Sequence, residues 1–331
     1  MIVYKSVWDF GREEEAVYGV YKIGEYPTKI LPRVIEILIE RFTKEGDTIL
    51  DPFCGGGTVA IEAKLQGRNS INYDVNPKAI EITRRRLKHL TKSMMLQMID
   101  HLIGKERKRR NKTNSRYEKI MIQKRIKALE ERKRKILDDN SIYHKTKHIC
   151  EVKDARELDL PEESVDAIIT DIPYASMIKY SDLPNDLSNI EDYDEFLKEL
   201  EKAFAKMWKT LKKGRYCVIL TADYRVGAAR TILPVHADVI QIMRRLGAVL
   251  FDIYVWRYYR SGGFRPFGAP PYQAMNVHIY ILVFYKPTGH EDFLNKKNRP
   301  VRYRPRLIEK LGKMREKGTE TTLEAYLKAN P

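Results

Sequence analysis

The sequence predicts an α/β protein in which a doubly wound, mostly parallel sheet is interrupted by a basic helical insertion. Three observations lead to this prediction. Apolar runs of strand length alternate with longer segments of helical periodicity, an order typical of parallel sheets covered by helices. One predicted strand enters a glycine-rich turn, and acidic residues stand at the ends of several strands. The alternation stops between residues 92 and 147, where Lys and Arg dominate, and then resumes.

The segment before the insertion has the order helix, strand, glycine turn, helix, strand, helix. Gly67 is expected to end the second of these helices, because glycine adopts the left-handed backbone that a helix C-terminus favours. The second strand runs directly into Asp74. The predicted helices are 30–42, 59–66 and 78–90, and the predicted strands are 47–50 and 70–73.

The insertion predicts two basic helices. From residue 105 to residue 135 there are 15 Lys or Arg residues and only four Glu residues. Apolar residues recur among them at helical spacing, and a polar break falls at 111–115. We expect a basic helical hairpin; the alternative is a solvated coiled-coil arm that mediates dimer contact. The apolar positions are Tyr117, Ile120, Ile126 and Leu129.

The sheet pattern resumes after Cys150. A predicted strand over 165–170 leads into Asp171, and a long helix over 193–211 is expected to be capped by Gly214. The last forty or so residues are basic and predict helix without a core of their own. The remaining predicted strands are 216–221, 249–256 and 277–285, with a helix over 234–246.

Composition indicates an intracellular protein with a polyanionic partner. The formal net charge is +16, and the charge is clustered, which favours nucleic acid over a merely solvated basic surface. Three widely spaced cysteines give neither a disulfide framework nor a zinc site. No apolar run is long enough to cross a membrane, so we expect a cytoplasmic location without membrane association. The abundance of Lys, Arg and Glu with few Gln resembles thermophile composition.

The glycine turn predicts a nucleotide-type cofactor site. Glycines allow close approach of the backbone to a ligand, and the following helix start offers free N–H groups. Asp51 is placed to bind an amino group, and Asp74, at the end of the next strand, to accept hydrogen bonds from ribose hydroxyls. Asp154, after a third strand, is a candidate for an adenine amino group. An ordinary tight turn with surface acids is the alternative. The turn itself is Asp51-Pro52-Phe53-Cys54-Gly55-Gly56-Gly57-Thr58.

A second segment, Asp171-Ile172-Pro173-Tyr174, predicts a clamp for a planar amino group. The lone pair of an exocyclic amino nitrogen is delocalised into its ring, which makes the nitrogen a poor nucleophile. The Asp171 carboxylate and a backbone carbonyl of Ile172 or Pro173 can accept both N–H hydrogens and release that lone pair. Tyr174 offers a flat face on which an extruded base can stack. The alternative is a plain turn at a strand end.

Together the two segments resemble the S-adenosylmethionine-dependent methyltransferases that modify nucleobase amino groups at cytosine N4 or adenine N6. The resemblance covers about 26–90 and 150–286, and it implies a Rossmann-like fold. It implies that S-adenosyl-L-methionine is the cofactor and S-adenosyl-L-homocysteine the product, and that no metal is needed. The implied catalytic residues are Asp171, Pro173 and Tyr174, with Pro173 as the backbone acceptor. The implied cofactor-binding residues are Tyr26, Pro27, Thr28, Asp51, Pro52, Phe53, Gly55, Gly57, Thr58, Asp74, Val75, Asp154 and Ala155.

The resemblance also implies a division of the chain into four parts. Residues 1–91 are expected to form the N-terminal part of the methyltransferase domain and 148–287 its catalytic part. Residues 92–147 are expected to form a nucleic-acid-binding arm, and 288–331 a basic helical tail.

The substrate is less sharply predicted. Ile172 replaces the first proline that is common at this position of the clamp in the family. In this respect the segment resembles that of ribosomal RNA adenine dimethyltransferases, which favours RNA as substrate and the addition of one or two methyl groups. The arm is rich in residues that contact phosphate and poor in those that read base edges, which also favours structured RNA. The downstream strands resemble DNA cytosine-N4 and adenine-N6 enzymes, so we expect cytosine N4 as the target atom. The expected substrate-binding residues are Ile172, Lys105, Arg107, Lys108, Arg109, Arg110, Phe264 and Arg265.

Two alternatives remain open from the sequence. One is a DNA methyltransferase, either solitary or part of a restriction system. The other is a nucleic-acid-binding protein that keeps the fold without catalysis, although the intact acidic positions favour an enzyme.

Overall fold

The computed structural model describes residues 6–10, 18–26, 30–174, 178–226, 231–257 and 278–289. The chain separates into one compact unit, Met1–Thr288, and a C-terminal segment, Gly289–Pro331. Residues 290–331 of the predicted tail, and the predicted substrate-binding residues Phe264 and Arg265, lie outside the described residues. The architecture below is that of the first unit.

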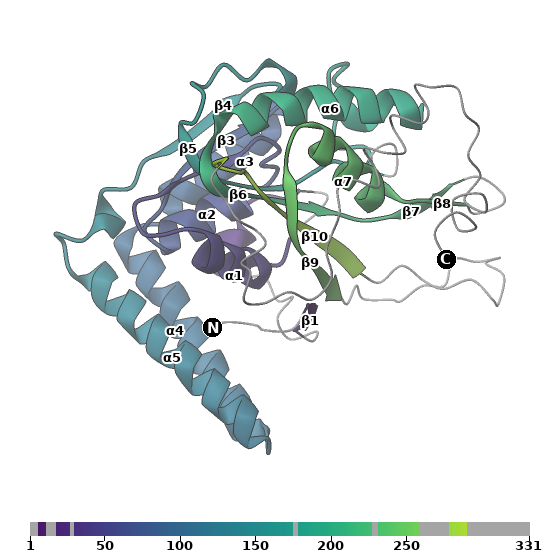
Figure 1. The fold of residues 1–331 in the computed structure, drawn as a ribbon. Helices are drawn as coiled ribbons and strands as arrows, with labels where there is room; N and C mark the ends of the chain where they lie inside the picture. Colours follow the sequence, from purple (N-terminus) through teal and green to yellow (C-terminus); the bar gives the residue numbers. More distant parts are fainter. Residues whose placement is uncertain are drawn as a thin grey trace, which may run out of the picture. The chain divides into compact units, whose positions relative to one another are not determined.

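Eight strands form one sheet in the order β1-β9-β10-β6-β5-β2-β3-β4 (Figure 1). The five strands from β4 to β6 in this order run parallel, whereas β10 is antiparallel to both β6 and β9. The sheet order reverses between β2 and β5, where doubly wound sheets bind their ligands. The predicted fold class is therefore confirmed. The strands are β1 Val7–Asp9, β2 Thr48–Asp51, β3 Asn69–Asp74, β4 His148–Val152, β5 Val165–Asp171, β6 Leu211–Thr221, β9 Val249–Arg257 and β10 His278–Tyr285; a separate hairpin pairs β7 Tyr224–Val226 with β8 Thr231–Leu233.

Helices cover both faces of the sheet. Consecutive residues Ile49 and Leu50 of β2 belong to different buried clusters, as the alternation of side chains along a strand requires. Ile49 packs with α1 and α2, and Leu50 packs with α6 and α7. The helices are α1 Pro32–Phe42, α2 Thr58–Leu65, α3 Pro77–His89, α4 Lys92–Lys112, α5 Arg116–Leu137, α6 Tyr193–Thr210 and α7 Val235–Arg245.

The insertion forms the two predicted helices, α4 and α5, and their break at 113–115 lies inside the predicted one. Figure 1 shows them side by side as a hairpin that extends away from the sheet. Its inner face carries an apolar stripe, in which Ile99, Ile122 and Ile126 are buried in one cluster with Ile61 of α2. The hairpin therefore packs against the helices of the sheet at its base.

Three features differ from the prediction. Gly214 does not cap α6, because the helix ends at Thr210 and β6 begins at the next residue. Gly214 lies within β6 with φ of +74°, close to a register irregularity between β5 and β6. Because β6 starts early, Leu211 pairs with Val165, and both of these apolar residues are buried. The short strands β1, β7 and β8 were also not predicted, because three residues carry too little periodicity.

Candidate active site

One cavity lies at the carboxyl ends of β2, β3 and β5, where the sheet order reverses. It brings together the glycine turn, the acid that follows β3 and the clamp segment that follows β5. The lining residues are Tyr26, Ile30, Asp51, Pro52, Phe53, Cys54, Gly55, Gly56, Thr58, Val59, Asp74, Val75, Asp154, Ala155, Asp171, Pro173, Tyr180, Asn185, Asp186 and Leu187.

Asp51, the last residue of β2, is almost fully buried at the floor of this cavity. Its carboxylate accepts hydrogen bonds from the Thr170 hydroxyl at 2.7 Å and from the Phe53 backbone N–H at 3.3 Å. Burial raises the pKa of Asp51 to about 7, although both hydrogen bonds act in the opposite direction. A cationic ligand group would favour the ionised form of this carboxylate.

Asp74 ends β3 and holds the glycine turn in place. Its carboxylate accepts hydrogen bonds from the backbone N–H groups of Gly55 at 2.8 Å and Asn76 at 2.9 Å. Burial raises the pKa of Asp74 to about 6. Gly55 has φ of +47°, and a Cβ atom there would lie 2.8 Å from the ring of Tyr26. Only glycine therefore lets the Tyr26 ring close over the turn.

Gly57, a predicted cofactor-binding residue, does not line the cavity. It precedes α2 with φ of +75°, and a Cβ atom there would lie 2.5 Å from the Thr83 side chain of α3. The structure thus gives Gly57 a packing role between α2 and α3. Pro27 and Thr28 lie outside the described residues.

Asp154 lines the cavity but is already engaged by a cation. Its carboxylate accepts hydrogen bonds from the Arg156 side chain at 2.6 Å and from the Arg156 backbone N–H at 2.9 Å. Arg156 also pairs with Glu199 of α6 at 2.6 Å. Contact of Asp154 with an adenine amino group stays a prediction, and the carboxylate would share its acceptor capacity with Arg156.

The clamp segment places two of its four residues in the cavity lining. Asp171 is half-buried at the end of β5, and its carboxylate accepts a hydrogen bond from the Tyr174 hydroxyl at 2.7 Å. Burial raises the pKa of Asp171 to about 7, against the effect of this hydrogen bond. Pro173 lines the cavity beside it.

Tyr174 and Ile172 are more deeply buried than the sequence suggested. Only 5% of Tyr174 is exposed, so its clearest role is to orient the Asp171 carboxylate. Ile172 is 1% exposed, belongs to the core cluster under α6 and is absent from the cavity lining. The structure therefore gives Ile172, a predicted substrate-binding residue, a packing role in the core.

Several lining residues escaped the sequence analysis. Tyr180, Asn185, Asp186 and Leu187 belong to the segment between β5 and α6. The Tyr180 ring stacks on Tyr26 with centroids 6.0 Å apart. Asp186 is buried and accepts a hydrogen bond from the Ser188 backbone N–H at 2.9 Å, which begins a 3-10 turn. That capping pattern is visible in the sequence, but its approach to the cavity is not.

The predicted basic residues of the arm lie toward the end of α4. Lys108, Arg109 and Arg110 are exposed, whereas Lys105 is partly buried and Arg107 pairs with Glu130 of α5 at 3.0 Å. Exposed cations at this position suit contact with phosphate, and that contact stays a prediction.

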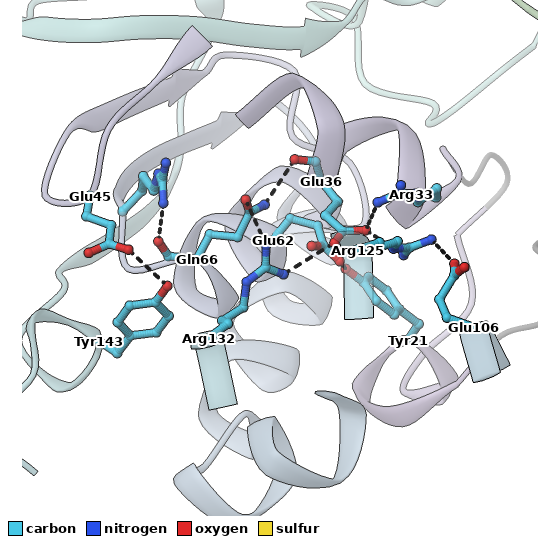
Figure 2. A network of polar contacts seen from close by, with 11 residues as sticks. Tyr21, Arg33, Glu36, Glu45, Glu62, Gln66, Glu106, Arg125, Arg132 and Tyr143 are labelled. Carbon is cyan, nitrogen blue, oxygen red and sulfur yellow. Dashed lines mark hydrogen bonds and ion pairs between the residues drawn. The ribbon is translucent and has the colours of Figure 1, made fainter. Parts of the chain in front are cut away.

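A buried ionic network joins the two helices of the arm to α1. Figure 2 shows Arg125 and Arg132 of α5 reaching the Glu36 carboxylate of α1, at 2.9 Å and 3.4 Å. Arg125 also pairs with Glu106 of α4, and Arg33 approaches Glu36 to 2.6 Å. All five side chains are at least nine-tenths buried. Buried charges fix one docking geometry because any unpaired charge is costly.

Neither a metal cluster nor a membrane helix is evident in the part of the chain that the structure describes. No three His, Cys, Asp or Glu residues gather there in a way that suits a metal ion. None of the described helices combines the length and apolar character needed to span a bilayer.

Comparison with known proteins places this site in a recognisable group. Residues 41–229 match the family described as RMKL-like, methyltransferase domain. A type II methyltransferase of Streptococcus pneumoniae, M2.DpnII, is 44% identical over 64 residues, 19% of this chain and 24% of that protein. The tRNA (guanine(10)-N2)-dimethyltransferase of Methanothermobacter thermautotrophicus is 38% identical over 65 residues, 19% of this chain and 19% of that protein.

The chain thus spans less than a quarter of the length of both relatives. Among solved structures, a candidate DNA modification methylase from Thermus thermophilus in complex with S-adenosyl-L-methionine is 29% identical. That alignment covers 45% of this chain and 61% of the other, with a TM-score of 0.33.

Proposed function

Because the chain belongs to the family of RMKL-like methyltransferase domains, we propose that it transfers a methyl group from S-adenosylmethionine to an exocyclic amino group of a nucleobase. The observation that carries the proposal is the Asp171 carboxylate. It lines the same cavity as Asp51 and Asp74 and is oriented by the Tyr174 hydroxyl at 2.7 Å. The net charge of +16 favours nucleic acid as the carrier of that amino group.

The cavity residues fit S-adenosylmethionine. Asp51 offers a buried carboxylate to a cationic amino group, and Asp74 offers one to ribose hydroxyls. The start of α2 presents backbone N–H groups beside the glycine turn, and Phe53 and Val75 supply apolar walls. When bound there, the cofactor supplies an electrophilic methyl group on a sulfonium sulfur.

The remaining chemistry belongs to the clamp. The Asp171 carboxylate and the Pro173 carbonyl accept the two amino hydrogens in a non-planar arrangement, which makes the nitrogen lone pair available. Tyr174 holds the carboxylate in one orientation, and its near-complete burial keeps water from competing for that oxygen. Proximity and orientation supply much of the rate.

We favour cytosine N4 in structured, ribosomal RNA as the target, with one or two methyl additions. The support is the exposed basic end of α4 and the high net charge of +16, which suit a folded, phosphate-rich partner. One relative is named as a tRNA enzyme and another as a type II methyltransferase, so a DNA amino group is the second candidate.

The deciding experiment offers labelled S-adenosylmethionine with ribosomal RNA and genomic DNA, both from a strain that lacks this gene. Nucleosides are then identified by mass spectrometry. We expect label in N4-methylated cytidine, whereas label in methylated deoxynucleosides would support the second candidate. Absence of label in both pools would refute the proposal.

A variant of the clamp tests the assigned role of Asp171. Asp171→Ala should reduce transfer by at least about 10²-fold, the usual effect of losing one preorganised electrostatic partner in an active site. Calorimetry should show S-adenosylmethionine binding largely intact, because Asp51 and Asp74 remain. Retained turnover in Asp171→Ala would remove the residue from the mechanism.

A further inference from the structure

A second group of polar side chains lies at the same edge of the sheet, on the side away from the cofactor cavity. Strand β6 neighbours β5, and Asp223 follows the end of β6. Tyr280 of β10 pairs with Thr221 at that same end. His236, near the start of α7, comes to Asp223 from the following helix.

The geometry of this group is well defined. His236 Nδ1 lies 2.8 Å from both carboxylate oxygens of Asp223, and the His236 backbone N–H donates to Asp223 Oδ1 at 3.1 Å. The imidazole stacks on the Tyr280 ring at a centroid distance of 4.0 Å and an interplanar angle of 13°. A carboxylate at Nδ1 fixes the tautomer with the proton on that nitrogen. The neutral ring therefore presents Nε2 as an acceptor.

Among the described residues, two other titratable groups near His236 have contacts of their own. Asp238 of α7 accepts a hydrogen bond from the Tyr193 hydroxyl of α6 at 2.8 Å. His278 of β10 meets the other ring of the stack, Tyr280, edge-on at 4.9 Å. Two imidazoles contact Tyr280, and among the described residues a carboxylate partner is seen for His236. The His236 side chain is 26% exposed.

The order of strands in the sheet places His236, Asp223 and Tyr280 on the side from which the substrate is expected to approach. The cofactor cavity is built on β2, β3 and β5, and Asp171 stands at its β5 border. With the cofactor in that cavity, a base whose amino group reaches Asp171 can approach from the β6 and β10 side. His236, Asp223 and Tyr280 stand at that side of the edge.

We propose that His236, held by Asp223 and stacked on Tyr280, contacts the target nucleotide and accepts the proton that its amino group loses on methylation. This inference rests on the proposed function. The amino lone pair forms the bond to the methyl carbon as the carbon–sulfur bond breaks and its electron pair stays on sulfur. The nitrogen, now cationic, passes one proton to Nε2 of His236. The resulting imidazolium is stabilised by the Asp223 carboxylate, an arrangement typical of general bases.

The test compares His236→Ala with His278→Ala, because both side chains lie at Tyr280 and only the first has the Asp223 partner. The substrate is whichever pool the wild type methylates, and kcat is measured from pH 5.5 to 8.5. We expect His236→Ala to lower kcat by about 10²-fold, the lower end of general base effects, across the measured pH range. Free imidazole should restore part of kcat. His278→Ala should keep the wild-type profile.

Three further readouts separate a proton acceptor from a merely structural residue. Calorimetry should give unchanged S-adenosylmethionine affinity in His236→Ala, and Asp223→Asn should lower kcat less than His236→Ala does, because the imidazole remains. The NMR signals of the His236 ring should shift when a methylatable oligonucleotide is added to the wild type. An unchanged kcat profile, or a loss of kcat that imidazole does not restore, would overturn the inference. A wild type that methylates neither pool would instead overturn the proposed function, and the inference with it.

Discussion

At the scale of single residues, the carboxylates of the cavity are tuned by burial. Asp51 and Asp171 have pKa values raised to about 7 and Asp74 to about 6. An unfolded carboxyl group ionises near pH 4, so each folded carboxyl keeps its proton longer than the unfolded one. The contribution of these three groups to the stability of the ligand-free protein should therefore fall as the pH rises from about 4 to 7. A bound cation would offset this cost, which links protonation to ligand binding.

The affinity for S-adenosylmethionine should accordingly depend on pH. If binding requires the ionised forms of Asp51 and Asp74, the affinity should fall about tenfold per pH unit below the pKa of each obligately ionised group. Calorimetry between pH 5.5 and 8.5 measures this directly, and Asp74→Asn should give a flatter profile. An affinity that is constant over this range would show that neither carboxylate must ionise.

A site residue could be predicted from the sequence where its signal lies in one short, contiguous segment. The glycine turn and the clamp could be located from the sequence because each is a contiguous segment at a strand end. The placements of Tyr180 and Asp186 could not, since they depend on how the segment after β5 folds back over the cavity. The inward orientation of Ile172 was equally hidden, because an apolar residue at a strand end can face either way.

At the scale of elements, the arm is fixed to the catalytic unit by charge. Burial alone would raise the pKa of Glu36, but the three arginines around it hold that pKa well below its usual range. The helices of the insertion were predictable from periodicity. The inward-facing Arg125 and Arg132 were not, since a helical pattern counts Arg as solvent-exposed.

Removing the shared carboxylate should destabilise the protein strongly. Glu36→Gln leaves the guanidinium groups of α5 without their anion and should cost about 3–5 kcal/mol in the free energy of unfolding. Urea denaturation at pH 7.5 measures this loss. The matched control is Glu81→Gln, whose side chain is 69% exposed and lies 4.0 Å from Arg85. That change should cost at most about 1 kcal/mol. Equal losses in the two variants would mean that the buried network does not fix the arm.

At the scale of the whole molecule, the polar groups of the candidate site and the dense set of cations lie in different parts of the chain. The sheet edge carries the polar groups of the reaction, and the insertion carries a dense set of cations. A partner that reaches both must be long and phosphate-rich, because an α-helix of about 20 residues spans about 30 Å. The buried network holds the two regions in one arrangement. Under the proposed function, we therefore expect the arm to constrain which folded substrates present a base to the clamp.

This separation predicts how the affinity for RNA depends on salt concentration. Replacing Lys108, Arg109 and Arg110 by Gln should weaken RNA binding and reduce the slope of log affinity against log salt by about one for each lost phosphate contact. The control replaces three exposed lysines of α6, Lys198, Lys206 and Lys209, which changes net charge equally but lies on another helix. A slope that changes as much in the control would assign the effect to net charge alone. If duplex DNA of the same length shows the larger loss, the arm positions a DNA duplex, and the second candidate function gains the support that RNA now has.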